Sequence, residues 1–213
     1  MNTKKEIFNF SKVENFDDHI NLSIPNYSGL SELFETFVYE YMPVNGVCVD
    51  IGCSTGRFLN SLRKSEGTYV GVDAVDFKDR HEGFVFVNGG IVDYLKTLER
   101  ADVLISMFAL QFLGPSERLA AIVELTRLVD GGACLLLAEK VFIESPKINQ
   151  LIHRSHIQFK RKGFTDKEIL DKDYELMGSM FCKTDKEIDN ELSFFGNYWQ
   201  VWQSYNFKAW CIN

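Results

Sequence analysis

Two glycines and an acidic residue lie close together where an apolar run ends in the first third of the chain. The run VCVDI contains Asp50, and Gly52 and Gly56 follow it directly. Glycine permits tight backbone curvature and lets a ligand approach the main chain closely. A helix that begins near Gly56 would present free backbone N–H groups to an anionic or polar ligand. The spacing therefore predicts a ligand-binding turn between a strand and a helix.

A second acidic residue, Asp73, ends the next apolar run, YVGVD. It follows Gly52 by about 20 residues, the offset at which an acid can hold both ribose hydroxyls of an adenosine ligand. Ser54 replaces the middle glycine of G-x-G-x-x-G, which weakens a dinucleotide interpretation because a pyrophosphate needs that close approach. We therefore predict S-adenosylmethionine, with Asp50 near its amino-acid end. Gly52, Cys53 and Ser54 would line it. No His lies near Cys53 in the sequence, which favours a wall residue over a nucleophile.

Alternating strands and helices must position these residues. Apolar runs typical of buried strands lie at 47–51, 68–73, 83–87, 101–108 and 133–141. Helical periodicity lies at 28–42, 57–65, 91–99 and 115–129. This order predicts an α/β fold with a doubly wound, mostly parallel sheet. We expect a helical region at 145–195 and two closing strands near the end.

Composition and charge narrow the class of protein. The 213 residues suit one domain, which we divide into a lead-in and helix (1–43), a cofactor-binding core (44–144), a helical region (145–195) and closing strands (196–213). The net charge of −7 argues against broad, sequence-independent nucleic-acid binding. Five cysteines without a CxxC pair predict no metal site and a reducing, cytoplasmic compartment. We see neither a signal peptide nor a membrane span.

Longer stretches of the sequence resemble a known family. They are FDDHINLSIPNYSGL, VDIGCSTG, FALQFLGPSERLAAIV, GGACLLLAEKV and HIQFKRKGFTDKEI. From about Tyr27 to the end, the chain resembles class I S-adenosylmethionine-dependent methyltransferases, and more narrowly it is similar to the carboxy-S-adenosylmethionine synthase family. The resemblance implies a seven-stranded Rossmann-like methyltransferase fold. It also implies that S-adenosylmethionine, S-adenosylhomocysteine or carboxy-S-adenosylmethionine is the bound form.

The family makes carboxy-S-adenosylmethionine from S-adenosylmethionine and prephenate, for modification of wobble uridine in tRNA. Its ligand contacts fall here on Tyr27, Gly52, Cys53, Ser54, Asp73, Ala74 and Ile91. Three further contacts of the family are changed, because its Asp, Asn and Arg become Gly90, Met107 and Asp173. Asp76, Asp79 or Asp93 would have to compensate for the change at Gly90, and Ser106 for the change at Met107.

The change to Asp173 bears on the reaction. In the family, the Arg at this position holds the extra carboxylate and reaches in from a partner subunit, which implies a homodimer. A carboxylate ligand beside Asp173 would be repelled where the family supplies a two-pronged guanidinium. A one-residue slip in the alignment would place Lys172 there instead.

Three functions follow from these observations. The first is an S-adenosylmethionine-dependent transferase, most simply a methyltransferase, acting on a small molecule with Tyr27, His156 or Tyr174 as the base. The second is carboxy-S-adenosylmethionine synthesis, with tRNA involved at most indirectly. The third is a non-catalytic dimer that binds S-adenosylmethionine or nothing.

Two other stretches have both structural and functional interpretations. His153 and His156 lie three residues apart among basic residues, which is typical of a solvated helix face and also of a surface for an acidic small molecule or an RNA phosphate. The aromatic tail, 198–210, favours closing strands or a dimer contact over a base-stacking platform.

Overall fold

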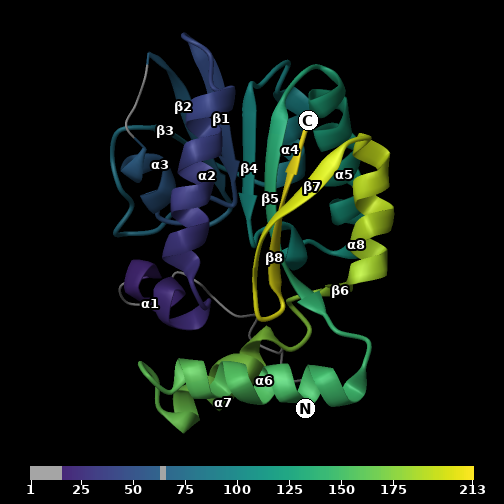
Figure 1. The fold of residues 1–213 in the computed structure, drawn as a ribbon. Helices are drawn as coiled ribbons and strands as arrows, with labels where there is room; N and C mark the ends of the chain where they lie inside the picture. Colours follow the sequence, from purple (N-terminus) through teal and green to yellow (C-terminus); the bar gives the residue numbers. More distant parts are fainter. Residues whose placement is uncertain (1–15, 63–65) are drawn as a thin grey trace, which may run out of the picture.

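The computed structural model describes residues 16–62 and 66–213, and one central sheet organises them (Figure 1). Its strand order is β3-β2-β1-β4-β5-β8-β7, and a short β6 pairs with β5 off this path. The strands are β1 (Gly46–Ile51), β2 (Gly67–Asp73), β3 (Val85–Asn88), β4 (Val103–Met107), β5 (Cys134–Phe142), β6 (Lys183–Thr184), β7 (Tyr198–Ser204) and β8 (Phe207–Ile212). Strands β1 to β5 pair in parallel and β8 runs antiparallel to both neighbours. The predicted doubly wound, mostly parallel α/β sheet is confirmed.

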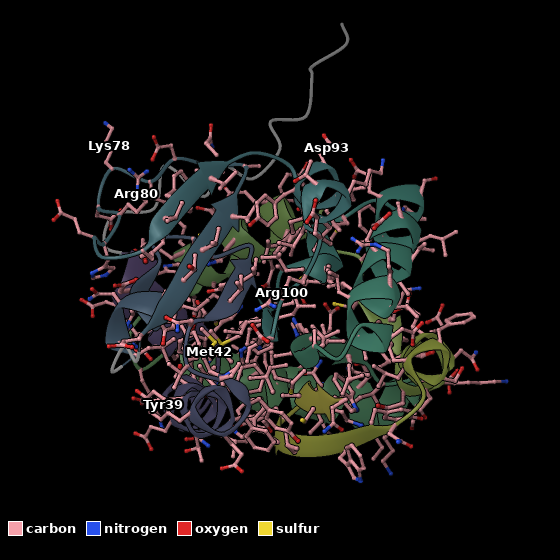
Figure 2. All side chains as sticks on the ribbon, turned by 90° about the horizontal axis from the view of Figure 1, so that it is seen from above. Tyr39, Met42, Lys78, Arg80, Asp93 and Arg100 are labelled. Atoms are coloured by element: carbon pink, nitrogen blue, oxygen red, sulfur yellow. The ribbon has the colours of Figure 1, made fainter. Side chains whose placement is uncertain are left out.

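Helices cover both faces of the sheet. They are α1 (Phe16–Ser23), α2 (Tyr27–Tyr41), α3 (Arg57–Ser61), α4 (Ile91–Thr97), α5 (Pro115–Asp130), α6 (Pro146–Lys160), α7 (Asp166–Leu176) and α8 (Asp185–Leu192), with short 3₁₀ turns η2 (Leu110–Phe112) and η3 (Ser193–Phe195). Helices α2 and α3 pack on one face, and α4, α5 and α8 on the other. Figure 2 shows α2, with Tyr39 and Met42 at its end, across the sheet from Asp93 on α4.

The alternation of side chains along each strand builds these two layers. In β1, Cys48 packs with Phe34 of α2, whereas Val49 and Ile51 pack with the cluster that contains Leu125 of α5. Both faces of β1 are therefore apolar, as expected for a parallel strand covered on each side. Asp50 interrupts this pattern on the α2 face, next to the end of the strand.

Several predicted boundaries differ from the structure. Helix α1 was not predicted, because its sequence is polar and we interpreted residues 1–26 as a lead-in, of which 1–15 lie outside the described residues. The helix predicted for 57–65 ends at Ser61, and residues 63–65 also lie outside the described part. The strand predicted from 101 begins at Val103, since the carboxylate of Asp102 instead accepts a hydrogen bond from the Val47 backbone N–H at 2.7 Å.

Three helices gather beyond one end of the sheet. Figure 1 shows α1, α6 and α7 beyond the carboxyl ends of the parallel strands, at the bottom of the view. Ligands of open α/β sheets bind in the crevice outside these strand ends. The helical insertion therefore lies where it can enclose a ligand.

Candidate functional site

A cavity of about 430 Å³ lies at the carboxyl ends of the strands. We divide its lining into two halves. The β1 half is formed by the residues that follow β1, β2 and β3, and contains Asp50, Gly52, Cys53, Ser54, Asp73, Ala74, Gly90 and Ile91. The β5 half is formed by the end of β5, by α6 and α7 and by their neighbours, and contains Gln111, Lys140, His156, Lys160, Lys172 and Phe207. A cavity of this size suits a small molecule.

The turn after β1 has the backbone geometry that its glycine suggested. Gly52 has φ of +76°, and a Cβ built there would lie 2.3 Å from the Cβ of Ala109. Ser54, at the position of the missing middle glycine, also has a positive φ of +50°. The turn therefore keeps a left-handed conformation at Ser54 without glycine, which costs stability for a residue with a side chain.

Asp73 fixes this turn through its side chain. Its Oδ2 accepts a hydrogen bond from the Ser54 N–H at 2.9 Å, and its Oδ1 accepts one from the Val75 N–H at 2.8 Å. Burial raises the pKa of Asp73, and these backbone N–H groups act in the opposite direction. Each carboxylate oxygen has a second lone pair, so Asp73 can still accept hydrogen bonds from ligand hydroxyls.

Asp50 is the least satisfied polar group of the β1 half. The residue is 2% exposed, and its buried Oδ1 has no hydrogen-bond partner among the described residues. Burial, and then the charge of Asp73, raise the pKa of Asp50 to about 8. A buried carboxylate without a partner is costly, so the site favours a ligand that brings a positive charge to Asp50.

Cys53 and Gly56 do not take part in chemistry in this geometry. Burial raises the pKa of the Cys53 thiol, which keeps it protonated and fits a wall residue. Gly56 is not among the cavity-lining residues. It has φ of +74°, and a Cβ there would lie 2.0 Å from the ring of Phe84. Gly56 is therefore required for packing behind the turn, and its contact with a ligand stays a prediction.

The structure places the three predicted bases differently with respect to the cavity. Tyr27 and His156 line the cavity, whereas Tyr174 does not and is 66% exposed. Burial and the charge of Asp50 raise the pKa of Tyr27, so its phenol stays protonated at neutral pH. Tyr174 therefore lies on the outside of α7, and its role as a base stays a prediction.

His156 is held as a neutral imidazole. Burial above all, and then the charges of Lys160 and Lys140, lower its pKa to about 4. Its Nε2 lies 2.8 Å from the Ser23 carbonyl oxygen, so Nε2 carries the proton and donates it. Nδ1 is then the nitrogen with the lone pair, and His156 is a weak base at neutral pH.

Two of the three changed positions of the family pattern lie in the wall of the cavity. Gly90 and Met107 line the cavity, but Asp76, Asp79 and Asp93 are not among its lining residues. Ser106 is fully buried and does not line it either. Of the described residues that we expected to compensate, none therefore reaches the cavity.

Helix α1 contributes a residue to the cavity that the sequence analysis did not predict. Asp17 lines the cavity, and its carboxylate accepts a hydrogen bond from Thr55 Oγ1 and pairs with His81 Nε2, both at 2.7 Å. Its backbone oxygen accepts a hydrogen bond from Arg57. These contacts fasten α1 over the turn after β1. The acidic first turn of FDDHINLS, which is favourable at a helix N-terminus, was the signal that could have revealed this helix.

The β5 half is rich in lysine. Lys140, Lys160 and Lys172 line it from the end of β5, the end of α6 and the middle of α7. Asp173 is not among the lining residues, and its Oδ1 pairs with Lys160 Nζ at 3.1 Å. The carboxylate of Asp173 is therefore engaged with a lysine and does not stand alone beside a ligand.

Curated relatives identify the family. A carboxy-S-adenosyl-L-methionine synthase of Marinobacter nauticus is 33% identical over 182 residues, which cover 78% of this chain and 72% of the relative. The chain belongs to the carboxy-S-adenosyl-L-methionine synthase family. Synthases of that name from Salmonella paratyphi C and Hydrogenovibrio crunogenus are each 28% identical and cover 92% and 95% of this chain and 86% of their own lengths. No protein-family model matches the sequence.

Solved structures support the fold of this family member. The plantazolicin methyltransferase BpumL matches with a TM-score of 0.61 and 12% identity, covering 92% of this chain and 88% of that chain. The small RNA methyltransferase HEN1 matches with a TM-score of 0.59 and 14% identity, covering 89% of this chain and 26% of that chain. At these identities the likeness concerns the fold alone, which is Rossmann-like with a seven-stranded main sheet.

The described residues contain neither a metal-binding cluster nor a membrane-spanning helix. Within 16–62 and 66–213, no group of three or more His, Cys, Asp or Glu side chains is arranged to hold a metal ion. No helix in the same ranges is long and apolar enough to cross a membrane.

Proposed function

We propose that this protein is an enzyme that binds S-adenosylmethionine in the β1 half of the cavity and transfers a group from it to a small molecule in the β5 half. The observation that carries the proposal is Asp50, whose buried Oδ1 lacks a partner beside the turn at Gly52. The ammonium group of S-adenosylmethionine would supply the missing charge. Asp73 would accept hydrogen bonds from the ribose hydroxyls, and Ala74, Gly90 and Ile91 would lie along the adenine.

The simplest reaction is methyl transfer. In-line displacement at the methyl carbon of the sulfonium requires mainly that donor and acceptor are aligned and that water is excluded. Helix α1, fastened by Asp17, and helix α6 enclose the cavity and support this role. His156, with Nδ1 free to accept a proton, is the best placed of the predicted bases, but its lowered pKa makes it effective only for an acceptor that loses its proton readily.

Carboxy-S-adenosylmethionine synthesis is the second candidate, and membership of the family favours it. The change to Asp173 argued against a carboxylated ligand. However, Lys160 pairs with Asp173, and Lys140 and Lys172 add positive charge to the same half of the cavity. A carboxylate in this half would therefore have lysine side chains nearby, which keeps this reaction open for the chain.

Product analysis separates these functions. The protein is incubated with S-adenosylmethionine, with and without prephenate, and the products are identified by mass spectrometry. Carboxy-S-adenosylmethionine that forms only with prephenate would establish the second candidate. S-adenosylhomocysteine that forms with another small acceptor would establish methyl transfer.

A binding experiment tests the cofactor site itself. We expect Asp73→Asn to weaken S-adenosylhomocysteine binding at least about tenfold, because a charge-assisted hydrogen bond to a ligand hydroxyl is lost. Asp76→Asn is the matched control, since Asp76 lies in the same loop, pairs with Arg80 and does not line the cavity. A protein that binds neither S-adenosylmethionine nor S-adenosylhomocysteine would favour the non-catalytic alternative.

The remaining expectations stay predictions. They are a single domain divided at residues 43, 144 and 195, a homodimer, a cytoplasmic location and an indirect link to tRNA modification. Size-exclusion chromatography with light scattering tests the homodimer directly.

A further inference from the structure

Two consecutive glycines, Gly89 and Gly90, follow β3 beside the cavity, and the backbone conformation does not require either of them. Neither has a positive φ, and Gly90 has φ of −72° and ψ of 141°, which any residue adopts. Gly52 and Gly56 are different, because their φ angles of +76° and +74° favour glycine. The reason for glycine at 89 and 90 must therefore lie elsewhere.

Close packing does not require these two glycines either. A Cβ built on Gly90 would have one described neighbour within 4 Å, Asp93 Oδ2 at 3.7 Å, and a Cβ on Gly89 would have none. Gly90 also lies at the N-cap of α4, where Ser, Thr, Asp or Asn is favoured because its side chain caps the helix, and no side chain does so here. The missing side chains therefore leave space next to the cavity, which Gly90 lines.

The position of this space relative to a bound cofactor follows from the sheet. Strands β1, β2 and β3 are parallel neighbours, about 4.8 Å apart. Asp50 lies in β1, Asp73 lies at the end of β2, and Gly90 lies just after β3. With the ammonium group of S-adenosylmethionine at Asp50 and the ribose at Asp73, the adenine extends toward Gly90. The exocyclic amino group is on the ring of adenine that is farther from the ribose.

The surroundings of the adenine offer it apolar contacts. Ala74 and Val75 after β2, and Ile91 after β3, line the cavity. Asp93 does not line the cavity, although its carboxylate lies near Gly90. The faces of the base would therefore be covered, while its far edge would meet the bare backbone of Gly90.

The carboxylates of the cavity have other contacts. Within the described lining they are Asp17, Asp50, Asp73 and Glu117. Asp50 and Asp73 are assigned to the ammonium group and the ribose, and Asp17 fastens α1. Glu117 accepts a hydrogen bond from the Gly114 N–H at 3.3 Å. Glu117 is therefore the described carboxylate whose contact with the base requires a direct test.

We propose that the gap left by Gly89 and Gly90 lies at the exocyclic amino group of the adenine, so that the site accepts cofactors in which this group is substituted or replaced by oxygen. Gly90 is then a specificity-determining residue. The proposal rests on the proposed function, which assigns the β1 half to S-adenosylmethionine. A site that hydrogen-bonds an amino group through a side chain strongly rejects the analogue without that group, and a site that lacks the side chain does not.

The test is isothermal titration with three ligands. They are S-adenosylhomocysteine, S-inosylhomocysteine, in which oxygen replaces the amino group, and S-adenosylhomocysteine with a benzyl group on the amino nitrogen. The variants are Gly90→Leu and Glu117→Gln. Gly114→Leu is the matched control, because Gly114 is the N-cap of α5 with φ of −60°, a Cβ there would lie 3.6 Å from Glu117 Oε2, and Gly114 does not line the cavity.

We expect the unaltered protein to bind all three ligands with affinities within about threefold of one another. Gly90→Leu should weaken binding of the benzyl ligand at least about tenfold relative to S-adenosylhomocysteine, because the leucine side chain occupies the gap. Gly114→Leu should leave the ratio of these two affinities unchanged. Glu117→Gln should affect S-adenosylhomocysteine and S-inosylhomocysteine equally.

Rejection of either analogue by the unaltered protein by about tenfold or more would overturn the proposal, and this comparison decides the matter if Gly90→Leu does not fold. A Glu117→Gln variant that binds S-adenosylhomocysteine more weakly, but not S-inosylhomocysteine, would also overturn it by assigning the amino group to Glu117. In both cases S-adenosylhomocysteine binds the unaltered protein and the proposed function stands. If none of the three ligands binds, the proposed function fails and this inference fails with it.

Discussion

Two adjacent residues of β5 lie in opposite electrostatic surroundings. Glu139 is fully buried on the α5 face and forms an ion pair with Arg118 at 3.1 Å. Arg118 also pairs with Glu191 at 2.7 Å, and Glu191 pairs with Lys183 at 3.2 Å. Lys140 lies on the other face, in the cavity, without a carboxylate partner among the described residues. The first cluster balances two cations with two carboxylates, whereas the second leaves positive charge for a ligand.

This difference separates residues that stabilise the fold from residues that bind ligands. Arg118 and Glu139 lie in two of the stretches that carry the family resemblance, FALQFLGPSERLAAIV and GGACLLLAEKV. The structure joins them in one buried ion pair that lies away from the cavity. A stretch that carries the family resemblance can therefore hold residues that stabilise the fold and do not line the cavity.

The largest expected effect is on the α5 face. Arg118→Met leaves Glu139 buried without its cation, and we expect the free energy of unfolding to fall by about 3–5 kcal/mol. Urea denaturation measures this loss. Lys167→Met, on the exposed side of α7, is the control and should change the free energy of unfolding by less than about 0.5 kcal/mol. Equal losses in both variants would contradict the structural role of the cluster.

A second substitution should repair the first. Adding Glu139→Gln to Arg118→Met removes the uncompensated buried charge, and we expect recovery of about half of the lost free energy of unfolding or more. The same urea denaturation gives the coupling between the two sites. Additive losses would mean that Arg118 and Glu139 contribute independently.

The cavity should respond to pH through Asp50. Because its pKa is about 8, Asp50 is largely protonated at pH 6 in the free protein and must lose its proton to pair with a ligand ammonium group. We therefore expect the affinity for S-adenosylhomocysteine to rise by about tenfold or more from pH 6 to pH 8. Isothermal titration should also detect proton release at pH 7. In Asp50→Asn the dependence on pH should be much weaker, and an unchanged dependence would exclude Asp50 as its source.

The smallest effect on stability is expected at Lys140. Its charge is desolvated and lacks a carboxylate partner among the described residues, so Lys140→Met should leave the free energy of unfolding unchanged or raise it by up to about 1 kcal/mol. Thermal unfolding measures the difference. A loss comparable to that of Arg118→Met would remove the contrast between the two faces of β5.

The sheet and the ligand turn could be predicted from the sequence because their signals are local. The apolar runs around Asp50 and Asp73 ended where the structure ends β1 and β2. Helix α1 could not be predicted from its apolar pattern, since its position depends on contacts of Asp17 with Thr55 and His81, which are distant in the sequence.

The β5 half was beyond sequence reasoning for a similar reason. Lys140, Lys160 and Asp173 are separated along the chain, and only the packing of α6 and α7 beyond the sheet brings them together. Alignment alone placed Asp173 against a ligand carboxylate. The structure instead pairs Asp173 with Lys160, which changes the electrostatic conclusion drawn from that position.

A crystal structure of the protein with S-adenosylhomocysteine would test the assignment of the β1 half most directly. We expect the ligand amino group within hydrogen-bond distance of Asp50 and the ribose hydroxyls at Asp73. S-adenosylhomocysteine bound with its amino group away from Asp50, or bound outside the β1 half, would contradict this assignment.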